Sequence, residues 1–171
     1  MKNVNTIQLV SKYQITQAFA ILAATMILPV LIHFLPNING QLSGAVLLPI
    51  FWAPLFATFV YKKHVALFAG IFAPLLNYLI LGRPAPEMVI TLGFEVVLFV
   101  LLLGWLKNFK FLQSRSAVPA YMISSLIVIV GLSLVGNLNN PFSFWWQSMM
   151  IAIPGILIMS ILNVAILRFR K

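Results

Sequence analysis

Cysteine and aspartate are absent from this chain of 171 residues, and Glu87 and Glu95 are its only acidic side chains. Without cysteine the chain can form neither a disulfide nor a thiolate metal site. Without aspartate it lacks the clustered carboxylates that hold metal ions in phosphoryl-transfer sites. It also has no glycine-rich phosphate-binding loop, so it is not expected to hydrolyse a nucleotide. The sequence therefore predicts a protein that is not an enzyme and that holds no metal or cofactor of its own.

Charge is scarce as well: 8% of the residues are charged and 62% are apolar, whereas a soluble domain carries about 25% charged residues. The net charge of +9 does not indicate nucleic-acid binding, because the cations occur in short groups between apolar stretches and are not interleaved with aromatic residues. We interpret these cations as flanking groups that lie beside anionic lipid headgroups. The bilayer is thus the expected solvent.

Six apolar stretches approach the ~20 residues that a helix needs to cross a bilayer. They cover residues 14–35, 42–61, 65–81, 87–106, 117–135 and 144–167. Short connections join them, so neighbouring helices are expected to pack antiparallel. The predicted fold class is an all-α membrane protein, a bundle of six transmembrane helices that forms a single domain over residues 1–171.

The cations fall on one side once these helices are placed in a membrane. Of the eleven Lys and Arg residues, all except Arg83 lie at the N-terminus, at the C-terminus, or in the second and fourth connections. Because cytoplasmic segments are enriched in Lys and Arg, both termini are expected in the cytoplasm. Residues 1–13 lack the small-residue cleavage site of a signal peptide, so the first span is expected to be retained. His33 and His64 then lie on opposite sides and cannot share a metal ion.

Several prolines lie inside these stretches, and each is expected to bend its helix because it leaves a backbone carbonyl without an N–H partner. They are Pro29, Pro49, Pro54, Pro74, Pro119 and Pro154. Bent helices form cavities more easily than straight ones.

Polar side chains gather toward the expected outer face, where they suggest a small ligand pocket. Glu95 lies eight residues into its helix, about 12 Å from the start, and a carboxyl group at that depth should face the bundle interior or a wet cavity. It either contacts a substrate or ties helices together as a packing residue. The tryptophans fit an interfacial aromatic belt equally well, and the asparagines fit turns. The predicted substrate-binding residues are Asn77, Arg83, Glu87, Glu95, Asn137, Asn140, Trp145 and Gln147.

The first span carries small residues along one helical face, namely Thr16, Ala20, Ala23 and Ala24. Small residues spaced in this way let another helix approach closely. The partner helix can belong to the same bundle or to another protein, and composition alone does not choose between them.

The chain resembles the substrate-binding S components of energy-coupling factor vitamin transporters. The similarity lies in its length, in its six spans with both ends inside, and in Ala20-Ile21-Leu22-Ala23-Ala24, which is similar to the Ala-x-x-x-Ala surface by which these proteins dock on a shared scaffold. Residues 44–49, 70–77 and 81–84 are similar in style to the family's second and third helices. Only Ala20 and Ala24 match a family motif residue by residue.

This resemblance implies a subunit of the bacterial plasma membrane that captures a vitamin from outside, beneath the loop of residues 36–41. It would deliver the vitamin inward by toppling on a transmembrane scaffold protein, and two ATP-binding subunits would use the ATP. The combination of Glu95, Trp145 and Asn140 is similar to the thiamine-binding type, so a thiamine-like or pyrimidine ligand is a hypothesis. Two other functions stay open: a membrane scaffold or complex-assembly subunit that transports nothing, and a self-contained channel or carrier.

Overall fold

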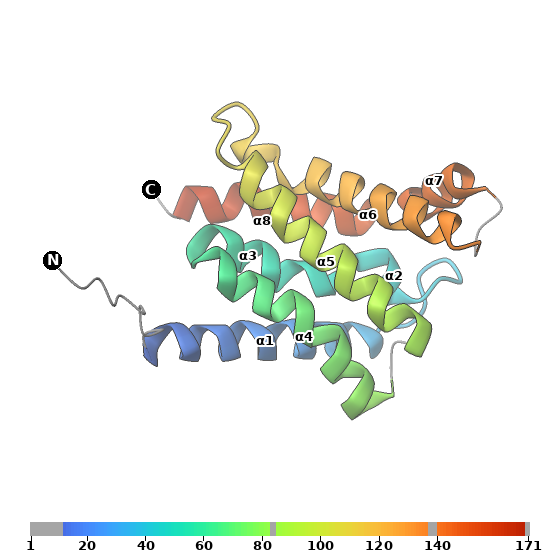
Figure 1. Ribbon diagram of the computed structural model, residues 1–171, viewed down its shortest axis with the longest axis horizontal. Coiled ribbons are helices and arrows are strands. Elements are labelled where there is room, and N and C mark those ends of the chain that lie inside the picture. The colour runs from blue at the N-terminus through green and yellow to red at the C-terminus, as the bar shows by residue number, and fades with distance from the viewer. Residues whose placement is uncertain (1–11, 83–84, 137–139, 170–171) are drawn as a thin grey trace, which may run out of the picture.

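A computed structural model describes residues 12–82, 85–136 and 140–169, and the regular elements within these ranges are helices (Figure 1). They are α1 (Lys12–His33), α2 (Ser43–Leu47), the single-turn 3-10 helix η1 (Pro49–Phe51), α3 (Trp52–Val60), α4 (Lys63–Leu81), α5 (Pro86–Leu106), the 3-10 turn η2 (Gln113–Arg115), α6 (Ala117–Leu134), α7 (Pro141–Ile151) and α8 (Ile153–Phe169).

Four stretches among the described residues are long and apolar enough to cross a membrane: Tyr13–His33, Lys63–Ile80, Pro86–Leu106 and Ala117–Leu134. The pair α7 and α8, bent by 65° at its junction, is a fifth candidate if the two helices form one span. The protein is therefore an all-α membrane protein with four or five candidate membrane-spanning helices. This confirms the predicted class and the first, third, fourth and fifth apolar stretches as long helices.

The second apolar stretch, residues 42–61, is a series of helical segments and not the single helix expected. α2 ends before Leu48, whose backbone is left-handed with φ 54° and ψ 42°, and Pro49 opens η1 directly afterwards. Proline has no N–H for the carbonyl one turn earlier, so a regular helix is interrupted there. Nothing in the sequence marks Leu48 for a positive φ, which is uncommon outside glycine.

The prolines have two roles. Pro29 and Pro74 lie inside the continuous helices α1 and α4. Pro54, Pro119 and Pro154 lie in the first turn of α3, α6 and α8, where an N–H needs no carbonyl partner. The bend expected at Pro154 is present at the α7–α8 junction. Pro54 and Pro119 begin helices instead of interrupting them, so the expectation of a bend within a longer helix was wrong there.

The short helix α3 lies at the centre of the bundle. Leu55 and Ala57 expose none of their surface, and Phe59 exposes 1%. α3 packs against α1, α4, α5 and α8. Just before it, the Phe51 ring meets Phe99 of α5 and Tyr121 of α6 edge to face, at centroid distances of 5.2 and 5.1 Å. The broken second stretch thus fills the interior around which the long helices are arranged.

A buried amide joins α8 to the connection between α5 and α6. The Nδ2 group of Asn163, which is fully buried, donates to the Gln113 carbonyl at 3.0 Å, and its Oδ1 accepts from the Ser116 hydroxyl at 3.3 Å. Buried polar groups are stabilising when they are bonded in this way. The connection is therefore held against α8 by hydrogen bonds as well as by apolar contacts.

The cations of the described residues lie at one end of the bundle. The start of α1, the turn between α3 and α4, the connection between α5 and α6, and the end of α8 all lie at this end, and the ends of α1, α4 and α6 lie at the other (Figure 1). The cations at these positions are Lys12, Lys62, Lys63, Lys107, Lys110, Arg115 and Arg168. The charge separation predicted along the sequence is thus a separation in space. His33 and His64 lie at opposite ends, as expected, because they fall at the end of α1 and the start of α4.

Large apolar side chains cover the outside of the bundle. Phe19, Leu79, Ile90, Trp105 and Ile161 are each more than half exposed, from 59% to 68%. An aqueous surface does not carry so continuous a layer of such side chains, whereas hydrocarbon solvates it. The exterior therefore fits the membrane class that hydropathy predicts.

Candidate ligand site and docking face

Glu95 lies on α5 facing α6, where it is half-buried beside two polar side chains. Its carboxyl group interacts with the hydroxyl of Ser125 and lies close enough to the Tyr121 phenol for an electrostatic interaction. Ser125 and Tyr121 are each 4% exposed. Because Phe51 packs against Tyr121, this polar group lies against the aromatic core.

This arrangement gives Glu95 two chemical capacities. Its carboxylate oxygens accept hydrogen bonds, so a ligand that carries N–H donors or a positive charge would be held there. The same oxygens link α5 to α6 through Ser125, which is the packing role considered for a carboxyl group at this depth.

The two adjacent tryptophans face opposite environments. Trp145 is 8% exposed and Trp146 is 51% exposed, because adjacent residues on a helix point in different directions. The Trp145 ring packs at 5.7 Å from Phe142 and 6.4 Å from Trp146, between ring centroids. Its Nε1 atom is buried and has no hydrogen-bond partner among the described residues. An indole N–H in this position is available to an acceptor other than those in the described residues.

Trp52, the first residue of α3, was not among the predicted site residues. Its Nε1 is likewise buried without a partner in the described part of the chain. The signal that could have identified it is its place beside Pro49 and Pro54 in an apolar stretch, because a tryptophan far from the membrane interface needs a partner for its N–H.

Asn77 lies on α4 and is 5% exposed, and its Oδ1 is the third buried polar atom without a partner among the described residues. It lines a small groove of about 200 Å³ between α1 and α4, together with Met26, Ile27, Val30 and Ile80. None of the groove's lining residues belongs to α5, α6 or α7, so the groove is separate from the environments of Glu95 and Trp145.

The remaining predicted ligand residues lie on the surface or outside the described ranges. Asn140 is exposed, and its Oδ1 caps α7 by accepting from the Ser143 backbone N–H at 3.2 Å, a local role other than the turn that the sequence suggests. Glu87 and Gln147 are exposed on α5 and α7. Arg83 and Asn137 lie outside the residues that the structure describes.

The predicted docking residues of α1 divide between two faces. Thr16, Ala20 and Ala23 are exposed, and Ile27, also exposed, continues their row. Ala24 is half-buried and packs against the core. Figure 1 shows α1 along an outer edge of the bundle. The face that is open to another helix is therefore centred on Ala20 and Ala23, with Ala24 at its margin.

No protein-family model matches the chain, and neither the curated proteins nor the solved structures contain a significant match. Within residues 12–82, 85–136 and 140–169 no group of three or more His or Glu side chains lies close enough to hold a metal ion.

Proposed function

We propose that the chain is the solute-capturing subunit of an energy-coupling factor importer in a bacterial plasma membrane. The observation that carries the proposal is the buried Nε1 atom of Trp145, which, like Nε1 of Trp52, has no hydrogen-bond partner among the described residues. Leaving such a group unbonded costs about 1–3 kcal/mol. A ligand with an acceptor for an indole N–H recovers that cost on binding, so an apo binding protein is expected to carry such groups.

The capture side is proposed to be extracellular, with six crossings and both termini in the cytosol. The cationic end of the bundle supports this orientation through the positive-inside rule. α2, η1 and α3 contribute 5, 3 and 9 residues, which together rise by about 27 Å. The hydrocarbon core is about 30 Å thick, so this broken stretch is long enough to be the additional crossing.

The docking step is proposed to use α1. Ala20 and Ala23 are exposed at the middle of the helix, where small side chains let a scaffold helix approach closely. The scaffold would in turn bring two ATP-binding subunits, because this chain has no phosphate-binding loop.

The ligand is proposed to be a vitamin-like heterocycle, thiamine or a pyrimidine being the first candidates. Isothermal titration of the purified protein against thiamine, pyrimidines and other vitamins tests this. Trp145→Phe keeps the ring volume and removes the N–H, and Glu95→Gln keeps the shape and removes the charge. We expect each variant to weaken the binding of the active compound by about tenfold or more. Absence of heat with every compound would reject a vitamin ligand.

A tagged chain purified from its native membrane tests the docking step. We expect it to carry a transmembrane scaffold and two proteins with phosphate-binding loops, and to lose them in Ala20→Leu and Ala23→Leu. Gly131→Leu on α6 is the matched control, because a side chain added at Gly131 meets nothing within 4 Å. Equal loss in the control would indicate general damage.

The alternative is a membrane scaffold that transports nothing, and the contact of Glu95 with Ser125 between α5 and α6 favours it. The Glu95→Gln variant distinguishes the two proposed functions. A ligand contact predicts weakened ligand binding with an unchanged melting temperature, whereas a packing contact predicts a lower melting temperature.

A further inference from the structure

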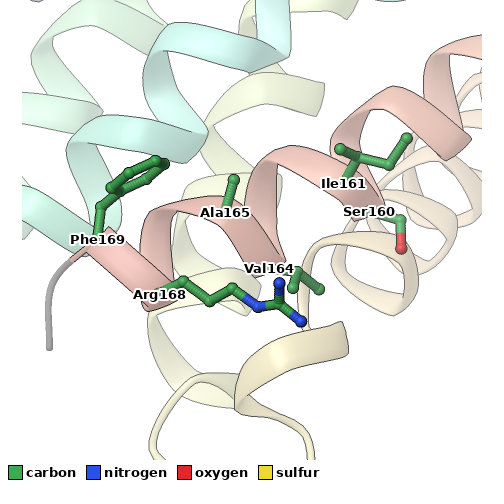
Figure 2. Close-up of a pocket in the computed structure, with 6 residues that line it drawn as sticks. All are labelled: Ser160, Ile161, Val164, Ala165, Arg168 and Phe169. Atoms are coloured by element: carbon green, nitrogen blue, oxygen red, sulfur yellow. The ribbon is translucent and has the colours of Figure 1, made fainter.

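A second hollow lies on α8 at the cationic end of the bundle (Figure 2). It is an open groove of about 550 Å³ lined by Ser160, Ile161, Val164, Ala165, Arg168 and Phe169. The lining residues form two adjacent rows along the helix, in which the members follow at intervals of four residues. The one-carbon side chain of Ala165 lies between the bulky Ile161 and Phe169, and this difference in size makes the surface concave.

The groove has the length and the position of one lipid leaflet. From Ile161 to Phe169 the helix rises about 12 Å, and one leaflet provides about half of a 30 Å hydrocarbon core. Ile161 is 68% exposed and Phe169 is 93% exposed, so both project from α8 beyond the hollow. A straight partner helix would rest on these two side chains and leave the hollow unfilled, whereas a flexible acyl chain can enter between them.

The charge at one end of the groove indicates the headgroup. Arg168 is exposed, and Figure 2 shows its side chain extended along the helix with the guanidinium beside Val164. Both acidic side chains of the protein are on α5, Glu87 at the opposite end of the bundle and Glu95 eleven residues before its last residue. Neither is placed to neutralise Arg168. Arg115, in the η2 turn that packs against α8, adds positive charge nearby.

We propose that this groove binds one anionic phospholipid, with an acyl chain between Ile161 and Phe169 and the headgroup phosphate on the Arg168 guanidinium. A guanidinium binds phosphate through paired N–H donors. The phosphate of a zwitterionic headgroup binds it less well, because the cation of the same headgroup competes with Arg168 for that phosphate. The site is independent of the proposed transport function, because it uses no residue of the ligand site or of the α1 face.

The test uses the full chain in a neutral detergent and follows thermal unfolding during titration. The additives are phosphatidylglycerol, phosphatidylcholine with the same acyl chains, and inorganic phosphate. We expect phosphatidylglycerol to raise the melting temperature at a concentration at least about tenfold lower than phosphatidylcholine does, and inorganic phosphate to have no comparable effect. Native mass spectrometry of a mixture of the two lipids should retain one phosphatidylglycerol molecule on the protein.

Three variants locate the effect. Arg168→Gln removes the charge, and Ala165→Leu fills the groove while keeping the charge; both should raise the half-effective phosphatidylglycerol concentration about tenfold. Lys110→Gln removes an exposed cation from the same end of the bundle outside the groove and should leave it unchanged. An equal effect of Lys110→Gln and Arg168→Gln, or an equal response to both lipids, would overturn the proposal. So would full stabilisation by phosphate alone, or an Ala165→Leu variant that folds and binds normally.

Discussion

At the scale of single residues, Gly155 controls how closely α2 and α8 approach. A Cβ atom at this position would lie 2.7 Å from the Leu47 carbonyl carbon and 2.8 Å from the Val46 oxygen. Neither contact can be relieved by rotating a side chain, because both atoms belong to the backbone. Gly155→Ala should therefore push the two helices apart and lower the stability by about 1–3 kcal/mol.

Thermal unfolding in detergent measures this effect, with Gly131→Ala as control. Gly131 also lies within a helix, but an added Cβ there meets nothing within 4 Å, so better helix propensity should leave the melting temperature equal or slightly higher. If both alanine variants melt alike, the close approach of α2 to α8 is not as described.

Asn163 gives the second prediction at this scale. Asn163→Leu removes the donor to Gln113 and the acceptor for Ser116 in a fully buried position. The Gln113 carbonyl and the Ser116 hydroxyl each lose their bond to Asn163 and keep only the bond of 3.1 Å between them, so a loss of about 1 kcal/mol or more is expected, measured as a lower melting temperature. Ser133→Ala is the control, since the Ser133 hydroxyl bonds only one turn back to Val130 in its own helix. An Asn163→Leu variant as stable as the control would show that the amide is dispensable.

At the scale of elements, hydropathy predicts long helices well and breaks poorly. The predicted stretch of residues 87–106 became α5, Pro86–Leu106, and residues 117–135 became α6, Ala117–Leu134. Both are runs of apolar residues with polar or proline boundaries. The break at Leu48 lies inside an equally apolar run, where Pro49 interrupts the helix and the Leu48 backbone is left-handed, and hydropathy registers neither feature. The division of Ala20 and Ala24 between two faces likewise depends on the neighbours of α1.

The candidate site was less predictable than the helices for the same physical reason. The depth of Glu95 was enough to place it facing the interior, but its contact with Ser125 depends on how α5 and α6 are rotated against each other. Asn140 was identified as polar and near the end of the bundle, while its capping bond to Ser143 is a local alternative that the same residue satisfies. Trp52 was missed because its lack of a partner is a property of the packed interior.

Pro154 is expected to cause the bend between α7 and α8. Pro154 supplies no N–H to the Met150 carbonyl, and the helices meet at 65°. In Pro154→Ala the restored N–H should let the two helices straighten. A straight helix from Phe142 to Ile161 would be about 28 Å long, and a 65° bend shortens this to about 24 Å.

Spin labels on cysteines introduced at Phe142 and Ile161, which are both exposed, measure this distance. The chain has no native cysteine that would also be labelled. The label distance should increase by about 4 Å in Pro154→Ala. Pro141→Ala, at the first position of α7, should change nothing. An unchanged distance in Pro154→Ala would mean that packing of α8 against α3 and α6, and not the proline, imposes the bend.

At the scale of the whole molecule, the broken second stretch determines on which side of the membrane every later segment lies. If residues 43–60 cross, the cations of the α3–α4 turn, of the α5–α6 connection and of the α8 end all share a side with the start of α1. If the same residues instead turned back as a re-entrant loop, each of these groups would lie opposite the start of α1, unlike the arrangement in Figure 1. A molecule of that kind would place most of its cations outside, against the usual bias of membrane proteins.

Single cysteines distinguish these arrangements because the unmodified chain gives no background. Gln41→Cys and Asn140→Cys should react with a membrane-impermeant maleimide in intact cells, whereas Lys62→Cys and Lys110→Cys should react only after the cells are opened. Comparing Gln41→Cys with Lys62→Cys shows whether residues 43–60 cross the membrane, because these two positions flank the broken stretch directly. If both react from outside, residues 43–60 do not cross, and the end of α8, with Arg168 and its lipid groove, faces the exterior.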